Sequence, residues 1–281
     1  MAVGQRRTAD RIQVGASLKR MRMEAEVSRE EAAALLGCTP VTVGNVEQGR
    51  TKIGQADLAA LLQLYRVPED QAADLLEVNR AARRSLRRVS GGSHIQPHQR
   101  RAADLIDSAH GMRYYSPDLF PGVLQHPAYA RAIMAPTGHV SDVLEARLQF
   151  RLGLAKVLTR DEPLRLSVVV GEAALRKNIG GPSTMRSQLA HVAKLCREQP
   201  NITIQVLPFS AREHYFMGAT VTVYSFGPRV PDIASVDTTI GEQFFDRDVS
   251  VAEAIGKFDD VRIKALDPLT SVDMLEELSS C

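Results

Sequence analysis

The sequence lacks several features that would place it in common classes of protein. Its 3 cysteines, Cys38, Cys196 and Cys281, are odd in number and widely spaced, which excludes a disulfide framework and a cysteine-based zinc motif. No apolar run approaches the roughly 18 residues that a membrane-spanning helix needs. The basic N-terminal residues are not followed by the apolar segment of a secretory signal. We therefore expect a cytoplasmic protein.

Signatures of catalysis are missing as well. The sequence contains no Gly-x-Gly-x-x-Gly, P-loop, His-Glu-x-x-His or Gly-x-Ser-x-Gly motif, and its 7 histidines lack the spacing of metal ligands. We therefore expect no enzymatic activity, no cofactor and no bound metal. A group of residues near the ends of predicted strands could still line a pocket, with loop and surface positions as the alternative: Glu213, His214, Tyr215, Asp237 and Glu242.

Charge is distributed unevenly along the chain. The length of 281 residues suggests about two domains. Residues 1–101 contain 17 Lys and Arg against 11 Asp and Glu, a net charge of +6, whereas the remainder contains 18 against 22, a net charge of −4. Solvated helix surfaces explain part of this charge but not the difference between the two parts. An excess of positive charge is what binding to nucleic-acid phosphates requires.

The most informative stretch lies near the N-terminal end. Ser28 and Glu31 have the spacing of a capping box that begins a helix, and Gly37 is suited to the tight turn that ends it. Thr39 and Pro40 are a favourable N-cap and first residue for a second helix. Two short helices joined by such a turn predict a helix-turn-helix, whose second helix enters the major groove of DNA.

Apolar residues at helical spacing continue on both sides of this motif. Within the motif, the residues expected to face inward are Ala32, Leu35 and Leu36 in the first helix and Val43 and Val46 in the second. The expected helices cover residues 11–26, 29–36, 40–48, 55–65 and a fifth segment that starts at Pro68. This pattern predicts a small all-α domain.

Four motifs resemble the XRE, or lambda-repressor-like, family of DNA-binding domains. They are Ser-Arg-Glu-Glu-Ala at 28–32, Leu-Gly at 36–37, Thr-Pro-Val-Thr-Val at 39–43 and Val-Glu-Gln-Gly-Arg at 46–50. The resemblance implies a five-helix lambda-repressor-like domain, which we place at residues 10–80. It also implies double-stranded DNA as the partner.

The resemblance and the helix pattern together indicate which side chains would contact DNA. Asn45 could pair with adenine, and Val41 could pack against a thymine methyl group. The expected base-contacting residues are Thr39, Pro40, Val41, Thr42 and Asn45. The expected phosphate-contacting residues are Arg29, Gln48, Arg50 and Lys52. Solvated positions on the helix surface are the alternative for each.

The resemblance further implies a structural ion pair. In the family, a basic residue of the first helix meets the glutamate of a Glu-x-Gly ending, and Arg22 and Glu47 occupy these positions. We expect a partly buried pair that holds the first helix against the third.

Residues 81–101 change in character and predict a basic linker. Arginines are frequent here, acids are absent, and Ser90-Gly91-Gly92-Ser93 lies in the middle with Pro97 following. The arginines could contact DNA phosphates, and a flexible, solvated hinge is the alternative.

Residues 102–281 predict a second domain of mixed α+β structure. An extended segment at 112–120 precedes expected strands at 164–170, 202–207, 220–226 and 233–237. Expected helices cover 102–111, 126–134, 140–158, 172–178, 182–198, 249–265 and 268–278. We expect Phe120, Leu124, Tyr129 and Phe209 to belong to the core.

Three long motifs of this part resemble the C-terminal domain of actinobacterial regulators of the WhiJ type. They lie at residues 117–133, 171–192 and 201–209. The resemblance implies a regulatory domain, often paired with a small partner protein and described as antitoxin-like. This sequence departs from the usual pattern at Gly171, where an acid is expected, and at Leu152, where glutamine is more usual.

Together these features predict a sequence-specific, DNA-binding transcriptional regulator, associated with the nucleoid when bound to DNA. We expect the C-terminal domain to form a homodimer, or to sense a partner protein encoded nearby or a small-molecule effector. The alternative is an antitoxin-like protein that mainly sequesters a small partner, with DNA autoregulation secondary. A second alternative is an enzyme with a DNA-binding head, with Glu172 or His214 as its test residues.

Overall fold

The computed structural model describes residues 9–85, 95–135, 141–226, 231–238 and 241–280. Contacts divide the chain into two compact units. The helical unit contains α1 to α5 and residues 99–108 of α6, and the larger unit contains the sheet and the remaining helices. Among the described residues, no helix is long and apolar enough to cross a membrane, and no group of side chains has the make-up of a metal site.

The helical unit is built from short helices. Their bounds are α1 (Ala9–Glu24), α2 (Arg29–Leu36), α3 (Pro40–Glu47), α4 (Gln55–Leu64), α5 (Glu69–Ser85) and α6 (Pro97–Ser108). α5 therefore extends into the stretch predicted as a linker, and α6 begins before the stretch ends. Residues 86–94, in the middle of that prediction, lie outside the described residues.

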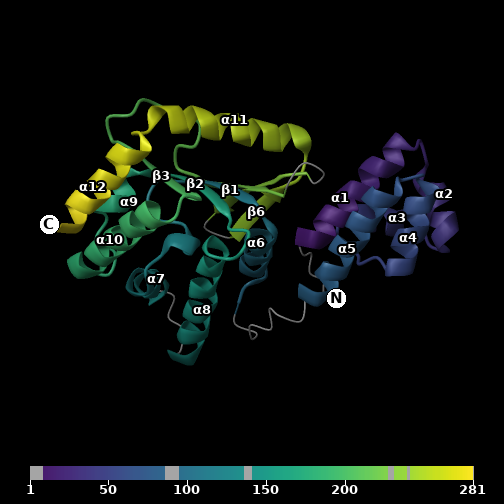
Figure 1. The fold of residues 1–281 in the computed structure, drawn as a ribbon, viewed down its shortest axis with the longest axis horizontal. Helices are drawn as coiled ribbons and strands as arrows, with labels where there is room; N and C mark the ends of the chain where they lie inside the picture. The colour runs from purple at the N-terminus through teal and green to yellow at the C-terminus, as the bar shows by residue number, and fades with distance from the viewer. Residues whose placement is uncertain (1–8, 86–94, 136–140, 227–230, 239–240, 281) are drawn as a thin grey trace. The chain divides into compact units, whose positions relative to one another are not determined.

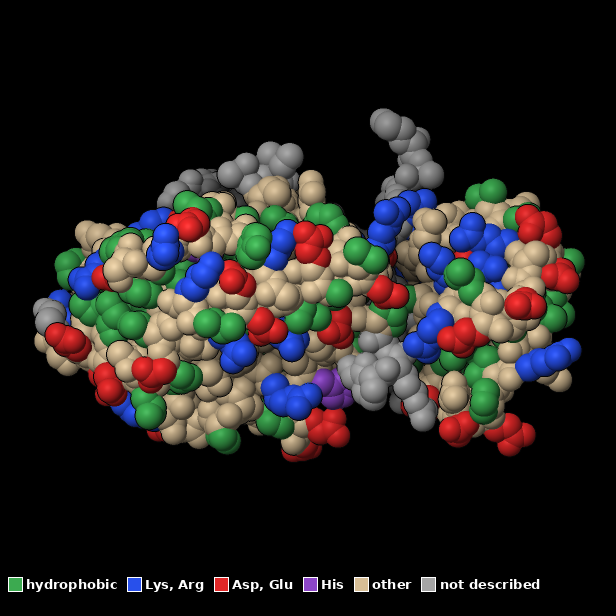
Figure 2. Space-filling model, turned by 90° about the horizontal axis from the view of Figure 1, so that it is seen from above, with side chains coloured by type: hydrophobic (Ala, Val, Ile, Leu, Met, Phe, Trp, Pro, Cys, Tyr) green, Lys and Arg blue, Asp and Glu red, His purple; other side chains and the backbone are tan. Residues whose placement is uncertain are grey.

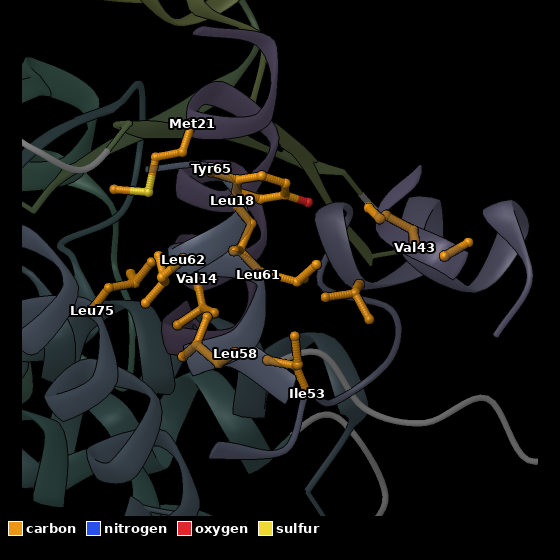
Figure 3. Packing of buried hydrophobic residues seen from close by; sticks show 13 residues of the cluster. Val14, Leu18, Met21, Val43, Ile53, Leu58, Leu61, Leu62, Tyr65 and Leu75 are labelled. Atoms are coloured by element: carbon orange, nitrogen blue, oxygen red, sulfur yellow. The ribbon is translucent and has the colours of Figure 1, made fainter. Parts of the chain in front are cut away.

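A single apolar cluster holds α1 to α5 together. α1, α4 and α5 contribute Leu18, Leu61 and Leu75 to this cluster (Figure 3). The second apolar position of α2 is Ala33, which is buried, whereas Leu35 is 49% exposed. The prediction of Leu35 as an inward-facing residue was wrong because the buried face of this short helix runs through Ala32 and Ala33.

The larger unit contains a six-stranded mixed sheet among its described residues. The strands are β1 (Gly111–Ser116), β2 (Arg165–Gly171), β3 (Ile202–Leu207), β4 (Thr220–Ser225), β5 (Ile233–Thr238) and β6 (Gly241–Phe245). Their order is β3-β2-β1-β4-β5-β6. β1, β2 and β3 are parallel, with Tyr115 opposite Val169 and Val169 opposite Gln205, and β4 to β6 continue antiparallel. The prediction of a mixed α and β domain is confirmed.

Helices cover both faces of the sheet. α11 (Asp248–Lys264) lies along one face and contacts β3, β4 and β5, while α7 (Pro127–Met134), α8 (Ser141–Gly153) and α10 (Pro182–Glu198) lie on the other (Figure 1). The remaining elements of the described part of the chain are η1 (Gly122–Leu124), η3 (Leu154–Leu158), α9 (Glu172–Arg176) and α12 (Pro268–Ser280). This arrangement buries strands on both sides, which is why β2 reads as a continuous apolar run.

The outer edge of β3 is closed by the chain itself. Val206 donates its N–H to Ser271 Oγ at 2.9 Å and accepts a hydrogen bond from Leu266 N–H at 2.9 Å. Gln205 donates through Nε2 to the carbonyl oxygens of Arg262 and Leu266. An exposed strand edge invites pairing with other chains, so these contacts protect this side of the sheet.

Candidate nucleic-acid interface

The turn between α2 and α3 is built from local backbone chemistry. Ser28 Oγ accepts the N–H of Glu31 at 3.1 Å, and the Glu31 carboxylate accepts the N–H of Ser28 at 2.7 Å, which completes the capping box. The backbone N–H and the hydroxyl of Ser28 both donate to the Glu31 carboxylate, and these two bonds lower the pKa of Glu31. Gly37 ends α2 at a φ of 61°, where a side chain would be strained. Thr39 then caps α3 by accepting the N–H of Thr42 at 3.2 Å.

The inner face of α3 is packed against the rest of the helical unit. Val43 and Val46 are 2% and 7% exposed, as the sequence predicted. Gly15 of α1 lies so close to the end of α3 that an added Cβ would stand 2.4 Å from Val46 O and 2.7 Å from Glu47 O. Only glycine allows this approach of α1 to α3. Sequence reasoning assigned no role to Gly15, although a glycine inside a helix signals close backbone contact.

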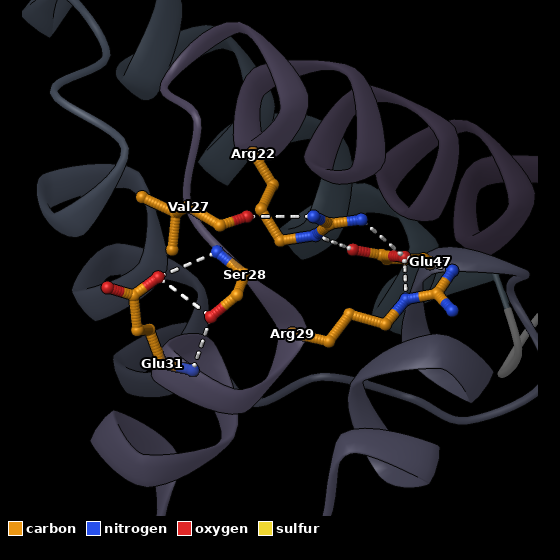
Figure 4. A network of polar contacts seen from close by, with 6 residues as sticks. All are labelled: Arg22, Val27, Ser28, Arg29, Glu31 and Glu47. Carbon is orange, nitrogen blue, oxygen red and sulfur yellow. Dashed lines mark hydrogen bonds and ion pairs between the residues drawn. The ribbon is translucent and has the colours of Figure 1, made fainter.

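Glu47 at the end of α3 is the centre of a polar network (Figure 4). Its side chain is 1% exposed and accepts Arg22 Nε at Oε1, 2.5 Å away. Arg22 Nη1 also donates to Val27 O at 2.8 Å. The hydrogen bond to Glu47 raises the pKa of Arg22, and burial opposes this shift. The structure thus brings together the two residues that the sequence paired.

Arg29 is the member of this network that sequence reasoning placed elsewhere. Its Nε and Nη2 atoms each lie 2.9 Å from Glu47 Oε2, so two of its three guanidinium nitrogens face the carboxylate (Figure 4). The side chain is 39% exposed, which leaves part of it at the surface. Arg29 as a phosphate contact stays a prediction, and the structure gives it a second, internal role.

The N-terminal end and outer face of α3 are open to solvent. Thr39 and Pro40 are exposed, Val41 is 72% exposed, and Thr42 and Asn45 are half-buried. The hydroxyl oxygens of Thr39 and Thr42 lie 3.0 Å apart, so each restricts the rotamer of the other. The apolar surface of Val41 is left in water by the rest of the helical unit, so contact with a partner that buries it would be favourable. All five predicted base-contacting residues therefore lie along one accessible edge.

The predicted phosphate contacts flank this edge. Gln48, Arg50 and Lys52 are exposed and follow the end of α3. The backbone N–H groups of Arg50 and Thr51 both bond to Asn45 O, which fixes the start of this loop. On the face drawn in Figure 2, the helical unit presents both Lys and Arg side chains and Asp and Glu side chains. The net positive charge of this part is therefore not gathered into one block on that face.

The larger unit contains a cavity of about 290 Å³. Glu213 and His214 line it, as does Glu172, whereas Tyr215, Asp237 and Glu242 do not. The pocket that the sequence suggested is therefore present with part of its expected lining.

One expectation near this cavity was wrong. Phe209 is 67% exposed and lines the cavity, whereas Phe120, Leu124 and Tyr129 are in the core as expected. Phe209 follows the end of β3 and no longer alternates into the sheet. The departure from the usual family pattern at Gly171 has a structural reason, because a Cβ there would lie 2.3 Å from Pro117 O.

Comparison with known families identifies both parts of the chain. A helix-turn-helix domain matches residues 13–75, and a domain of unknown function, DUF5753, matches residues 99–277. The first match assigns the N-terminal part to a kind of domain that DNA-binding regulators carry. No curated protein and no solved structure matches the chain.

Proposed function

We propose, from the premise that this chain belongs to the DUF5753 family and carries a helix-turn-helix domain, that it regulates transcription by reading specific DNA sequences. The larger unit would control when the helical unit binds. The proposal includes no catalytic step. It places the protein in the cytoplasm, at the nucleoid when bound.

The accessible edge of α3 is the observation that carries this proposal. The inner face of the helix is fixed by Val43, Val46 and the Glu47 network, so its orientation is set before any partner arrives. The opposite edge presents Val41 for a thymine methyl group and Asn45 for adenine. A rigid helix with an apolar and an amide group on its free edge has the chemistry of major-groove readout.

The finer parts of the proposal concern assembly and control. A single helix-turn-helix contacts only a few base pairs, so we propose a homodimer that binds two half-sites about 34 Å apart or a multiple of that distance. The motif resemblances support an XRE-type head and a WhiJ-type regulatory domain, as in actinobacterial regulators. On this basis the larger unit receives a small ligand or a small partner protein.

Selection from a random-sequence duplex library tests the proposal. The full chain should enrich a motif at moderate salt, and Asn45→Ala should change or erase one base preference in that motif. Asn201→Ala, at an asparagine of the larger unit that bonds Leu158 O and Leu164 O, is the matched control and should select the wild-type motif. Failure of the folded wild-type chain to enrich any sequence would reject sequence-specific binding.

An antitoxin-like role, the alternative to DNA reading, predicts a different experimental result. Such a protein would co-purify with a small partner in a stable complex, and its biological effect would persist when α3 is changed. Expression together with a small protein encoded beside it, followed by purification of the wild-type and Asn45→Ala chains, distinguishes the two roles. The proposed regulator requires that the biological effect weakens in the Asn45→Ala chain.

A further inference from the structure

The cavity of the larger unit lies where the three parallel strands end. β1, β2 and β3 end at Ser116, Gly171 and Leu207, and the residues that immediately follow two of them, Pro117 and Pro208, line the cavity. In open α/β sheets, ligands bind beyond the carboxyl ends of the strands. The volume of about 290 Å³ is near the lower limit for ligand pockets.

A chain of hydrogen bonds leads into this cavity. Phe216 N–H donates to His214 Nδ1 at 3.3 Å, so the neutral imidazole carries its proton on Nε2. Burial lowers the pKa of His214, with a further lowering by Lys264, which favours this neutral form. His214 Nε2 lies 3.3 Å from the hydroxyl oxygen of Tyr115 and donates to it. The Tyr115 O–H is then left as a donor, and Tyr115 lines the cavity.

The charged groups of the cavity are already engaged. The Glu172 carboxylate accepts Phe209 N–H at 2.9 Å and Arg176 Nε at 2.6 Å, and its side chain is 13% exposed. These bonds lower the pKa of Glu172. Arg212 and Glu213, of opposite charge, are exposed at the margin. The site therefore offers no net charge that would select an ionic ligand.

Apolar side chains surround the polar donor. Leu207 and Ala211 line the interior, while Phe209 and Met217 line the cavity at 67% and 69% exposure. Large apolar side chains at this exposure still have most of their apolar surface in water. They can therefore gain free energy when the body of a ligand covers them. The cavity thus combines an apolar wall with one directed hydrogen-bond donor.

We propose that this cavity binds a small, uncharged, mainly apolar molecule whose acceptor oxygen receives the Tyr115 hydroxyl hydrogen. The inference deepens the proposed function, on which it rests for its regulatory meaning, because the ligand would be the signal that the larger unit receives. His214 is a positioning residue in this site, since it acts on the ligand through Tyr115.

A matched pair of probes tests the site. 2-Acetylnaphthalene and 2-ethylnaphthalene have nearly the same shape, and only the first carries an acceptor oxygen. Titration of the full chain with ¹³C-methyl-labelled methionine should shift the NMR signal of Met217, in the cavity lining, and not that of Met23, which is 62% exposed on α1. The acetyl compound should bind about three- to tenfold more tightly, which is the value of one net hydrogen bond.

Three variants separate the hydrogen bond from the apolar contacts. Tyr115→Phe should remove the preference for the acetyl compound, whereas Tyr215→Phe, at a neighbouring exposed tyrosine outside the lining, should keep it. Ala173→Leu places a larger side chain on the cavity wall and should weaken the binding of both probes. Because this variant adds apolar volume at a half-buried position, it also tests the site if Tyr115→Phe fails to fold.

The outcomes distinguish this inference from the function on which it rests. Absence of a Met217 shift with either probe, or a preference that survives Tyr115→Phe, would overturn the assignment of the cavity. If the duplex selection still yields a motif in that case, DNA reading stands without this ligand site. If the probes bind as expected and no motif emerges, the cavity stands and the proposed DNA function fails.

Discussion

A single buried carboxylate, that of Glu47, joins three helices of the helical unit. It ends α3, and it binds Arg22 from α1 and Arg29 from the first turn of α2. A buried carboxylate is costly unless cations and hydrogen bonds satisfy it, and here both arginines do so. The network therefore holds the DNA-facing helix in one orientation relative to its two neighbours.

Replacement of Glu47 tests this network. Glu47→Ala leaves the Arg22 guanidinium, whose side chain is 12% exposed, without its carboxylate partner. We expect the free energy of unfolding to fall by about 3 to 5 kcal/mol, measured by urea denaturation. Arg29→Ala is the control and should cost only about 0 to 1 kcal/mol, because Arg29 is partly exposed. Equal losses in the two variants would contradict the central position of Glu47.

Two glycines near α3 provide a second test at this scale. Gly15→Ala forces a Cβ against the carbonyl oxygens of Val46 and Glu47, so α1 must move away from α3. We expect a loss of about 1 to 3 kcal/mol in the free energy of unfolding. Gly44→Ala inside α3 meets the Arg29 side chain at an ordinary 3.7 Å and should be neutral or stabilising, since alanine favours helix. Thermal unfolding measures the stability of both variants. A Gly15→Ala variant more stable than the Gly44→Ala variant would contradict the close packing of α1 against α3.

The structural role of a residue could be predicted from the sequence where one short motif determines both the local backbone and the hydrogen bonds. Ser28, Gly37 and Thr39 are such cases, because caps and positive φ depend on near neighbours. The contact of Arg29 with Glu47 could not be predicted, because it joins helices through tertiary packing. A side chain at Gly171 is excluded by the backbone of Pro117, which lies 54 positions earlier in the chain. The sequence around Gly171 carries no signal of this contact.

At the scale of elements, α3 is the part that we propose to read DNA. Asn45→Ala should reduce the affinity for the selected duplex by about 1 to 3 kcal/mol and leave the affinity for unrelated duplex unchanged, because it removes a base contact and no charge. Lys52→Ala should weaken binding to both duplexes alike. It should also reduce the slope of the logarithm of the binding constant against the logarithm of the salt concentration by about one. Fluorescence anisotropy at several salt concentrations measures both. A loss that is independent of sequence for Asn45→Ala would rule out base reading.

α10 gives a prediction about acid stability in the larger unit. Burial, followed by the charges of His126 and Lys194, lowers the pKa of His191 from 6.5. The folded chain therefore binds this proton less readily than the unfolded chain, and stability is lost as the pH falls from about 6.5 through the lowered value. We expect His191→Gln to make the free energy of unfolding depend less steeply on pH between 7 and 5. Identical slopes for wild type and variant in denaturant titrations would contradict this prediction.

The elements themselves were largely predictable, with one informative exception. β2 and β3 are apolar runs buried on both faces, so their sequence pattern is strong. β6 was not predicted, because Gly241–Phe245 is half-buried or exposed and carries two polar residues among five. Such an edge strand forms by pairing with β5, and pairing between strands leaves little trace in a short sequence window.

At the scale of the whole molecule, the account requires two copies on one operator. We expect sedimentation or light scattering of the full chain with a selected duplex to give two protein chains per duplex. The selected motif should contain half-sites whose centres lie about 10 base pairs apart, or a multiple of that spacing. A single chain per duplex at micromolar concentration, with a motif of one half-site, would contradict the proposed dimer.

The central claim is that the edge of α3 from Thr39 to Asn45 confers sequence preference on the protein. It is tested most directly by the ratio of dissociation constants for a scrambled and a selected duplex at one fixed salt concentration. We predict a ratio of at least about 10³ for the wild-type chain, and a ratio near one for a Val41→Ala, Thr42→Ala, Asn45→Ala variant that remains folded. A wild-type ratio near one, or an unchanged ratio in that variant, would contradict the account.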